Sequence, residues 1–357
     1  MRGSARGRTS ARRRALPLLA ALVLLSILAA ACSSSSSSGG SSSGSSSGAL
    51  KKGLKVFIIP KNLGNNYFTT ADSAKTGGAI SALDTLGESG TETSGTAATP
   101  ASQIPAIQAA IAKGANVLIV SATDPSALCP TLNAAMKKGI TVVTYDSDAP
   151  GCRDLFVNQA STAEIGTSEV DLLAKELHDT GEIGIVSAAA TATNQNAWIG
   201  YMKQELTKYP NMKLVSTVYG NDDPPTATQV TEGLLEKYPD LKGIISPTTV
   251  GILAAAQVVA TPKWKGKVVV TGLGTPDEMK AYVSDGVSPA FILWNPANLG
   301  FLAAYAAVYL ASKKITNAAG QTFTAGKLGK YTVGADNTVL LGPPTVFNSA
   351  NINKFNF

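Results

Sequence analysis

The chain has 357 residues and a formal net charge of +6, from 30 lysines and arginines against 24 aspartates and glutamates. Six arginines stand before residue 15, and removing those six from 30 leaves 24 basic and 24 acidic residues, so the rest of the chain is neutral. This balance excludes a strongly basic surface for nucleic acid, and one histidine with three cysteines offers no ligand spacing for a metal site.

The first 31 residues have the features of a secretory signal. The arginines precede an apolar stretch, ALPLLAALVLLSILAAA (15–31), which Cys32 follows. This stretch is shorter than the roughly 20 residues of a membrane span, which disfavours a transmembrane anchor. A cysteine after small residues resembles the lipobox of bacterial lipoproteins, although Ala29 stands where leucine or valine is usual. We expect residues 1–31 to be removed and Cys32 to be lipidated.

A serine- and glycine-rich segment, SSSSSSGGSSSGSSSGA (33–49), comes next. This composition buries no apolar surface and forms a flexible linker. We therefore interpret residues 32–50 as a lipidated cysteine and its tether. The expected location of the following domain is extracytoplasmic, on the outer face of the cell membrane, with the lipid as its only membrane contact.

From Lys51 onward, short apolar runs alternate with segments of helical periodicity, which predicts βαβ units and parallel sheets. The first predicted strands are 54–60, 115–122 and 140–146, with helices near 68–86 and 127–138. The segment 87–98 stands where a second strand is expected and has a weak strand pattern. Later predicted strands are 155–158, 182–188, 213–219, 242–247 and 267–273, with one more before ILWNP. The repetition predicts two similar α/β lobes.

Cys129 and Cys152 remain once Cys32 is assigned to the anchor. Outside the cytoplasm such a pair is more often bridged than free. Cys129 opens the helix after one predicted strand and Cys152 lies just beyond the next, which are neighbouring places in this architecture. We predict a Cys129–Cys152 disulfide.

Polar residues follow the predicted strands at their carboxyl ends, where open α/β sheets bind ligands. These stretches are PKNLGNNYF, YDSD, TATNQN, SPTTV, GLGTP and ILWNP. They offer one amine, amides, hydroxyls, carboxylates and the aromatic rings of Tyr67, Phe68 and Trp294. Carboxylates and amides bond to sugar hydroxyls, and aromatic rings pack on the apolar face of a pyranose. The six stretches together predict a cleft for a polar small molecule.

The stretch TATNQNAW (191–198) admits two interpretations. Its amides both donate and accept hydrogen bonds, which suits a neutral, hydroxyl-rich ligand. Alternatively, it is a polar loop in which Asn194 caps the following helix, since asparagine is a preferred N-cap.

Seven motifs together resemble one family over nearly the whole chain after the tether: PKNLGNNYFTTAD, SATDPSALCP, VVTYDSDAPGC, ATNQNAWIGYMK, ISPTTVGILAAAQ, TGLGTPDEM and LWNPANLG. They are similar to the periplasmic sugar-binding proteins of ABC importers, of the rhamnose-binding lipoprotein type and close to the autoinducer-2 receptor. The resemblance implies a type I periplasmic-binding-protein fold, in which two doubly wound, Rossmann-like lobes are joined by a hinge. It also implies a monomer that delivers its ligand to ABC permease subunits, with no cofactor.

The expected N-terminal lobe is 51–157 plus 296–335, and the expected C-terminal lobe is 158–295 plus 336–357. Hinge strands near 157–160 and 293–296 would absorb the backbone change when the lobes close over a ligand.

The resemblance carries the six ligand-binding positions of the autoinducer-2 receptor onto this chain. Four match, and at the other two Asn194 replaces an aspartate and Thr249 an alanine, in line with rhamnose-type relatives. This resemblance places the TATNQN loop at the cleft. The predicted ligand-binding residues are Lys61, Asn65, Tyr67, Phe68, Asp146, Asn194, Gln195, Pro247, Thr249, Trp294 and Asn295.

The expected function is therefore capture of a neutral sugar, with L-rhamnose or a similar deoxyhexose first. Another neutral sugar or polyol, and autoinducer-2, are the alternatives. An enzyme is disfavoured because a single histidine gives no Ser-His-Asp or Cys-His set, and Asp146 and Asp148, a conceivable glycosidase pair, alternate along a strand end. A sugar-responsive repressor would carry a helix-turn-helix where this chain has a signal and a tether. A sensor that feeds a membrane kinase would capture its ligand in the same way and stays open.

Overall fold

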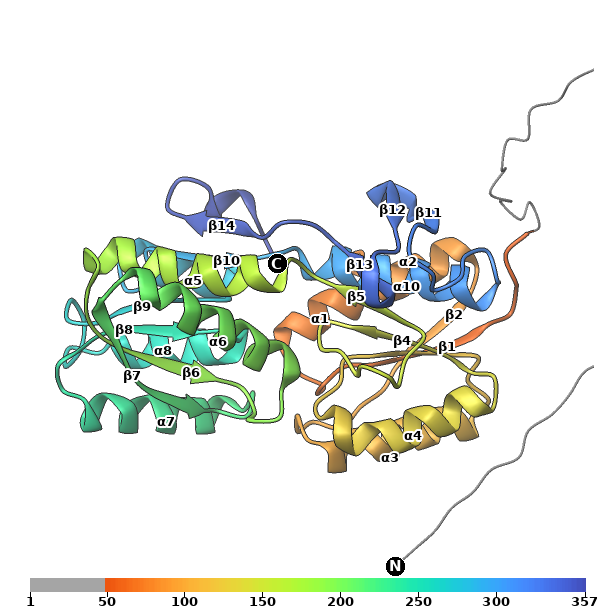
Figure 1. Ribbon diagram of the computed structural model, residues 1–357, viewed down its shortest axis with the longest axis horizontal. Helices are drawn as coiled ribbons and strands as arrows, with labels where there is room; N and C mark the ends of the chain where they lie inside the picture. Colours follow the sequence, from red (N-terminus) through yellow and green to blue (C-terminus); the bar gives the residue numbers. More distant parts are fainter. Residues whose placement is uncertain (1–48) are drawn as a thin grey trace, which may run out of the picture. The chain divides into compact units, whose positions relative to one another are not determined.

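The structure is a computed structural model, and it describes residues 49–357. The predicted signal sequence, Cys32 and the tether up to residue 48 lie outside this range. The described chain forms two α/β lobes, each built on a largely parallel sheet (Figure 1). The predicted fold class is therefore confirmed.

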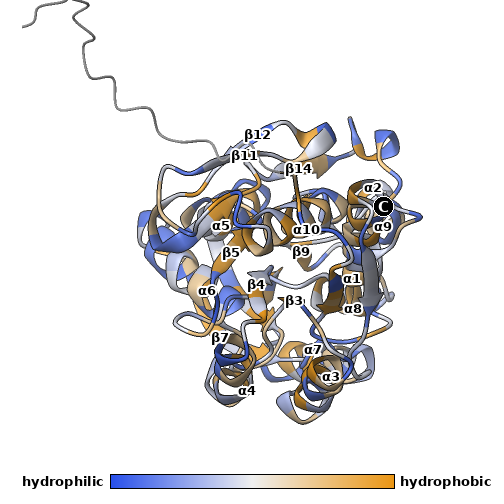
Figure 2. Ribbon diagram, turned by 90° about the vertical axis from the view of Figure 1, so that its right-hand side faces the viewer, coloured by the Kyte–Doolittle hydropathy of each residue, from blue (hydrophilic) through white to orange (hydrophobic). Residues whose placement is uncertain are grey.

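The N-terminal lobe contains a six-stranded parallel sheet in the order β13-β5-β4-β3-β1-β2. One face carries α3 and α4, and the other carries α1, α2 and α10; Figures 1 and 2 both show α4 below the strands and α10 above them. The two faces use alternate strand residues, because Phe57 and Ile59 join the core under α3 and α4 while Ile58 joins the core under α10. The strands are β1 (Lys55–Ile59), β2 (Ser89–Glu92), β3 (Val117–Val120), β4 (Thr141–Tyr145), β5 (Leu155–Asn158) and β13 (Thr338–Leu340). The helices are α1 (Asn66–Asp72), α2 (Ala79–Leu86), α3 (Pro100–Ala112), α4 (Pro125–Lys137) and α10 (Pro296–Ala311).

The C-terminal lobe repeats this strand order. Its parallel sheet runs β7-β6-β8-β9, and a bridge between Leu273 and Ile292 joins it to the antiparallel pair β10-β14. The helices lie on both faces, since Gly243 of β8 faces α5 and Gly184 of β6 faces α7. The strands are β6 (Thr180–Ser187), β7 (Asn211–Tyr219), β8 (Leu241–Ser246), β9 (Val269–Gly272), β10 (Ala290–Leu293) and β14 (Thr345–Asn348). The helices are α5 (Thr162–Leu177), α6 (Thr193–Glu205), α7 (Pro224–Lys237), α8 (Thr249–Val259) and α9 (Pro276–Ser284).

Local sequence fixes where several helices begin. Proline is at the start of α3, α4, α7, α9 and α10, where its missing N–H costs no hydrogen bond. In four of these helices the side chain of the preceding residue accepts a hydrogen bond from the first turn; the caps are Thr99, Asp124, Asp223 and Asn295. Each of these capping residues comes after a strand and its loop. It therefore marks where the connection from the carboxyl end of that strand stops and the next helix begins.

The predicted helix near 68–86 is wrong as a single element, because residues 73–78 separate α1 from α2. Gly78 lies so close to the end of α1 that a Cβ atom there would be 2.1 Å from the carbonyl oxygen of Ala71. The glycine lets the chain turn back against its own first helix. The weak segment 87–98 does contain a strand, β2, at the edge of the sheet.

One predicted lobe boundary is wrong. The C-terminal lobe was expected to resume at residue 336, yet β13 pairs in parallel with β5, with Val339 opposite Val157. The chain returns to the C-terminal lobe only after Leu340 and enters β14 at Thr345. The antiparallel hairpin of β11 (Thr322–Thr324) and β12 (Lys330–Thr332) was not predicted.

Cys129 in α4 and Cys152 beyond β4 form a disulfide, with Cα atoms 5.3 Å apart. This confirms the predicted pairing. No helix within residues 49–357 combines the length and hydropathy of a membrane span.

Candidate functional site

A buried cavity lies where the carboxyl ends of strands from both lobes meet, the usual ligand position in open α/β sheets. Polar and aromatic side chains of both lobes form its wall. Its lining residues are Lys61, Asn65, Tyr67, Phe68, Asp146, Gln195, Trp198, Asp222, Pro247, Thr248, Thr249, Leu273, Leu293 and Trp294. The cavity volume is about 30 Å³.

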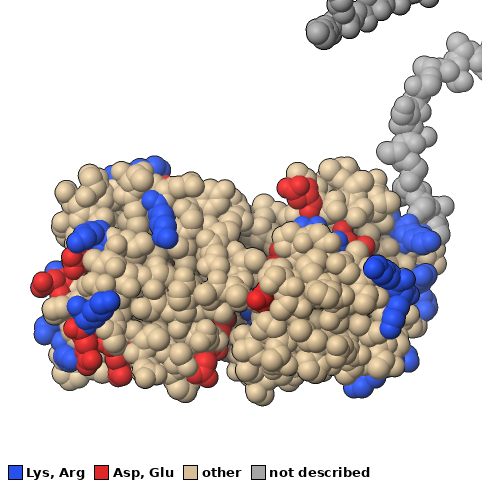
Figure 3. Space-filling view, turned by 60° about the horizontal axis from the view of Figure 1, so that its bottom comes forward, with Lys and Arg blue, Asp and Glu red and all other residues tan. Residues whose placement is uncertain are grey.

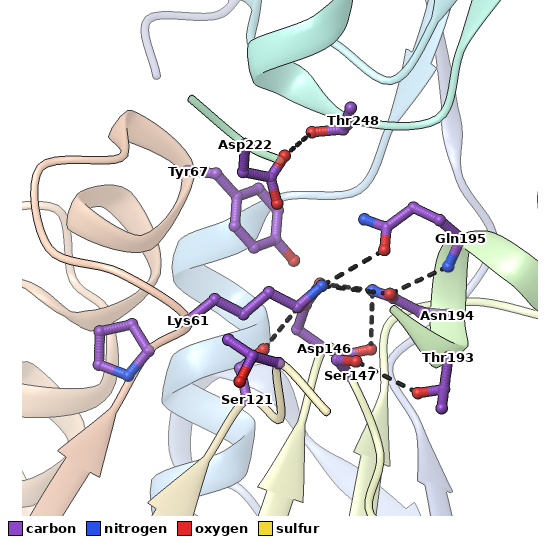
Figure 4. A network of polar contacts seen from close by, with 12 residues as sticks. Lys61, Tyr67, Ser121, Asp146, Ser147, Thr193, Asn194, Gln195, Asp222 and Thr248 are labelled. Carbon is purple, nitrogen blue, oxygen red and sulfur yellow. Dashed lines mark hydrogen bonds and ion pairs between the residues drawn. The ribbon is translucent and has the colours of Figure 1, made fainter. Parts of the chain in front are cut away.

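Lys61, which follows β1, is the centre of a polar network that crosses between the lobes (Figure 4). Its Nζ donates to Asn194 Oδ1 at 3.2 Å and to Gln195 Oε1 at 3.4 Å. The same nitrogen lies 3.7 Å from Asp146 Oδ2. The amine and the carboxylate are both buried, so their attraction is little screened by water.

Asp146 directly follows β4 and has a left-handed backbone conformation, with φ of 60°. Its Oδ2 accepts from the Ser121 hydroxyl at 2.7 Å, and Asn194 Nδ2 donates to Oδ1 at 3.4 Å. Burial raises the pKa of the Asp146 carboxyl, and the charge of Lys61 and the Ser121 hydrogen bond work in the opposite direction. The neighbouring Asp148 is paired with Arg153 at 2.8 Å and does not line the cavity, which removes the second carboxylate of a glycosidase pair at this strand end.

Aromatic rings form one wall of the cavity. Trp294 Nε1 donates to the Tyr67 hydroxyl at 2.9 Å, and the two rings are nearly perpendicular. Trp294 also contacts Trp198 of the C-terminal lobe, with ring centroids 6.1 Å apart. Burial raises the pKa of Tyr67 well above its ordinary value, and the charge of Asp146 adds to the effect. Tyr67 therefore presents a neutral hydroxyl to the cavity.

A second buried carboxylate supports this wall from behind. The Tyr145 hydroxyl donates to both oxygens of Asp72, at 3.0 and 2.8 Å. The Tyr145 ring packs edge-on against Phe68, at 6.1 Å between centroids. Burial raises the pKa of Asp72 well above its ordinary value, and the charge of Glu92 adds to the rise. The hydrogen bonds to Asp72 hold Tyr145, the residue before Asp146, in a fixed position.

Helix α6 begins at Thr193, with Ala192 at its N-cap position and no side-chain cap. The alternative that Asn194 is the N-cap is therefore wrong. Asn194 lies in the first turn, where its Oδ1 accepts from the Gln195 N–H at 3.0 Å as well as from Lys61. Its Nδ2 faces Asp146.

The structure brings most of the predicted ligand-binding residues together. Nine line the cavity, and Asn194 hydrogen-bonds to three of those nine. Asn295 does not line it; its side chain accepts from the Asn298 N–H at 3.1 Å and caps α10. Sequence reasoning missed five lining residues: Trp198, Asp222, Thr248, Leu273 and Leu293. Asp222 had a usable signal, because the polar stretch GNDDPP follows β7 at the same edge as the other motifs.

Within residues 49–357 there is no group of three histidine, cysteine, aspartate or glutamate side chains that could hold a metal ion. The chemistry of the cavity is that of hydrogen bonding and ring contact. A buried amine, carboxylates, amides and hydroxyls can bind a ligand that both donates and accepts hydrogen bonds.

Residues 56–315 match the family model of the periplasmic binding protein domain. A sugar ABC transporter structure from Actinomyces odontolyticus is 41% identical, with a TM-score of 0.66, and the match covers 85% of this chain and 98% of that one. An ABC transporter solute-binding protein of Clostridium phytofermentas with bound L-rhamnose is 36% identical over the same shares, with a TM-score of 0.81. LsrB of Clostridium saccharobutylicum in complex with AI-2 is 27% identical, with a TM-score of 0.78 and coverage of 85% of this chain and 100% of that one.

The chain also matches two curated allose-binding relatives at 28% identity, and it spans 36% and 39% of their lengths. The proteins of this family are binding proteins and not enzymes. The family model covers most of the described chain, and the two-lobed fold with its interlobe cavity agrees with it. The chain belongs to the periplasmic binding protein family.

Proposed function

We propose that this protein is the solute-binding component of an ABC importer and that it captures a neutral sugar, with L-rhamnose or a similar 6-deoxyhexose as the first candidate. One observation carries the proposal: hydrogen-bonding side chains and aromatic rings from both lobes surround a single buried cavity. Such a site satisfies ring hydroxyls and covers the apolar face of a pyranose at the same time.

The charges of the cavity favour a neutral ligand over a sugar acid. Lys61, Asp146 and Asp222 are the charged side chains of its lining, which gives one positive against two negative groups. A carboxylate or phosphate on the ligand would add a third negative charge in a poorly screened site. Sugar hydroxyls instead donate to the carboxylates.

Two findings support a deoxyhexose. A relative that is 36% identical over 98% of its length was solved with bound L-rhamnose. The cavity also has an apolar side, formed by Leu273, Leu293 and Trp294, which suits the methyl group of a 6-deoxy sugar better than a sixth hydroxyl.

Autoinducer-2 is the second candidate, because the LsrB structure contains AI-2 and matches the chain at 27% identity. The resemblance gave that receptor an aspartate and an alanine where this chain has Asn194 and Thr249. An amide donor and an extra hydroxyl at these positions favour a ligand with more hydroxyl groups.

Ligand entry requires the lobes to separate. A volume of 30 Å³ holds about two water molecules, and Lys61 of one lobe already bonds to Asn194 of the other. The chain passes between the lobes at 159–161, 294–295 and 341–344, between the last element of one lobe and the first of the next. Rotation about these segments would open the cavity, and closure would trap the sugar for delivery to the permease.

We further propose that the protein acts outside the cytoplasm as a lipoprotein. Cys32, after an apolar run and before a serine- and glycine-rich segment, supports this. Mass spectrometry of protein purified from its native membrane should show a mature chain that begins with an acylated Cys32. An unmodified N-terminus downstream of Cys32 would contradict the proposal.

Calorimetric titration of the purified protein with a panel of ligands tests the function. The panel consists of L-rhamnose, L-fucose, D-allose, D-ribose, L-rhamnonate and autoinducer-2. We expect the tightest 1:1 binding with L-rhamnose or another neutral 6-deoxyhexose, and no binding of the anionic L-rhamnonate. Tighter binding of autoinducer-2 than of every sugar would overturn the sugar assignment in favour of the second candidate.

A further inference from the structure

The cavity contains a second carboxylate that reaches it from the opposite lobe. Asp222 follows β7 in the C-terminal lobe, and its side chain is 7% exposed. In Figure 4, Asp222 and Thr248 lie across the site from Asp146 and Ser121, with Tyr67 and Lys61 between them. Asp222 and Asp146 therefore line the same cavity from opposite sides.

The surroundings of Asp222 orient its carboxylate without using all of it. The Thr248 hydroxyl donates to Oδ1. Within residues 49–357 this is the one hydrogen bond of the Asp222 side chain, so Oδ2 is open to a partner in the cavity. This oxygen is not among the fully buried atoms that lack a partner, so it can be reached from the cavity, and a ligand hydroxyl could donate to it.

Thr248 and the backbone show that this orientation is built in. Thr248 occupies the N-cap position of α8, where a threonine oxygen normally accepts from the helix, yet it makes no side-chain cap bond. Its hydroxyl donates to Asp222 instead. Asn221 and Asp222 both have positive φ, at 56° and 51°, a conformation uncommon outside glycine and best tolerated by asparagine and aspartate.

Asp222 also stands where the buried cavity meets a larger one. A cavity of about 650 Å³ opens between the lobes on this side, and it shares Asn65, Asp222 and Thr249 with the buried cavity. The space-filling view shows the groove between the lobes (Figure 3). A sugar that enters through this groove meets Asp222 before it reaches Asp146.

We propose that Asp222 is a ligand-binding residue that selects for a sugar with hydroxyl donors on two opposite sides, one for Asp146 and one for Asp222. The proposal rests on the sugar-binding function above. Burial raises the pKa of Asp146, and the Asp222 charge adds to the rise, so the two carboxylates repel each other across the cavity. The cavity lining sets Lys61 as its positive charge against these two carboxylates, so a ligand that donates to both would offset part of their repulsion.

The test combines a protein variant with ligand analogues. Asp222→Asn keeps the side-chain shape, and asparagine tolerates the positive φ. Dissociation constants of wild type and variant are measured by calorimetry for the panel sugar that wild type binds tightest and for its monodeoxy analogues. We expect Asp222→Asn to weaken the parent sugar about 10- to 100-fold. One monodeoxy analogue, which lacks the hydroxyl that donates to Asp222, should bind both proteins with nearly equal affinity.

The matched control is Asp336→Asn. Asp336 has the same backbone conformation, with φ of 52°, and is exposed in the other lobe. This variant should bind the parent sugar like wild type. If Asp222→Asn does not fold, Thr248→Val takes its place, because it removes the hydroxyl that orients Asp222. Thr248→Val should weaken binding of the parent sugar by a smaller factor, and it should bind the same monodeoxy analogue with nearly the affinity of wild type.

The outcomes separate the inference from the function. If wild type binds no panel sugar, both fall. If wild type binds a sugar and Asp222→Asn binds it equally well, only the inference falls. An equal loss of affinity for the parent sugar and every monodeoxy analogue would assign Asp222 a purely structural role and would also overturn the inference.

Discussion

Asn194 is the position at which L-rhamnose and autoinducer-2 favour different side chains most clearly. Its amide oxygen accepts from Lys61 Nζ at 3.2 Å and from the Gln195 N–H at 3.0 Å, while its amide nitrogen lies 3.4 Å from Asp146 Oδ1. An aspartate would keep both acceptor roles. Only the donor would be lost, and a second carboxylate would then stand beside Asp146.

Asn194→Asp should therefore leave the stability of α6 unchanged and weaken L-rhamnose binding by about 1–3 kcal/mol, the usual cost of an unpaired buried polar group. Calorimetric titration and thermal unfolding of the variant measure the two effects separately. Gln204→Glu is the control, since Gln204 is exposed in the same helix. Unchanged affinity in Asn194→Asp would reduce this residue to a local role at the start of the helix.

At the scale of single residues, sequence reasoning was strongest for residues within three positions of the end of a strand. Lys61 after β1 and Asp146 after β4 lie in the cavity as predicted. Asn295 also follows a strand, but the first turn of α10 takes its side chain as a cap. Asp222 was missed although it obeys the same rule. Leu273 and Leu293 lie in the stretches GLGTP and ILWNP, but they were not predicted as lining residues, because an apolar cavity wall and an apolar core look alike in sequence.

Helix α5 contains a feature that makes stability depend on pH. Glu169 is fully buried, and neither carboxylate oxygen has a hydrogen-bond partner within the described residues. Burial raises the pKa of this carboxyl well above its ordinary value of 4.5. The folded state therefore keeps the proton when the unfolded chain has lost it. The stabilising effect is complete below the unfolded-state pKa and is lost as pH rises through the folded-state pKa.

Glu169→Gln removes this titration. The free energy of unfolding of the variant, relative to wild type, should increase as pH rises from about 5 to about 8. Urea denaturation at several pH values measures it. Glu232→Gln, an exposed change in α7, should show no such trend. A pH-independent difference between Glu169→Gln and wild type would show that Glu169 does not titrate in this range.

The disulfide fastens α4 to the segment after β4. Closing a loop of this length, 23 residues apart in sequence, should stabilise the fold by about 3 kcal/mol. The double variant Cys129→Ala, Cys152→Ala should lose that amount in urea denaturation and keep its ligand affinity, because neither cysteine lines the cavity. Equal stability of the variant and oxidised wild type would contradict the predicted contribution.

At the scale of elements, local pattern predicted the strands of both sheets well and their connections less well. Apolar runs such as VLIV in β3 are visible to any periodicity argument. The break between α1 and α2 depends on Gly78 fitting against Ala71, a tertiary contact. β13 has three residues and becomes a strand only by pairing with β5, where Thr338 lies opposite Phe156, 182 positions earlier. Such elements are set by partners distant in sequence.

At the scale of the whole molecule, the two lobes share a strand order and meet at their ligand-binding edges. Besides Lys61 and Asn194, the Thr193 hydroxyl donates to the Asp148 carbonyl oxygen at 3.3 Å, and the Thr191 hydroxyl donates to the Thr123 carbonyl oxygen at 3.4 Å. These polar contacts bridge the lobes beside the cavity. A sugar that binds the closed lobes better than the open ones would shift the equilibrium toward closure.

A sugar that binds between the lobes would lie against Trp198 and Trp294. The chain has three tryptophans, and Trp264 lies outside the cavity lining. Fluorescence titration of a Trp264→Phe variant with L-rhamnose therefore reports on the cavity alone. We predict a saturable change with 1:1 stoichiometry, and loss of that change in Asp146→Asn, a substitution that the positive φ of Asp146 tolerates. An unchanged signal at sugar concentrations that saturate calorimetric binding would place the ligand elsewhere and would contradict sugar binding between the lobes.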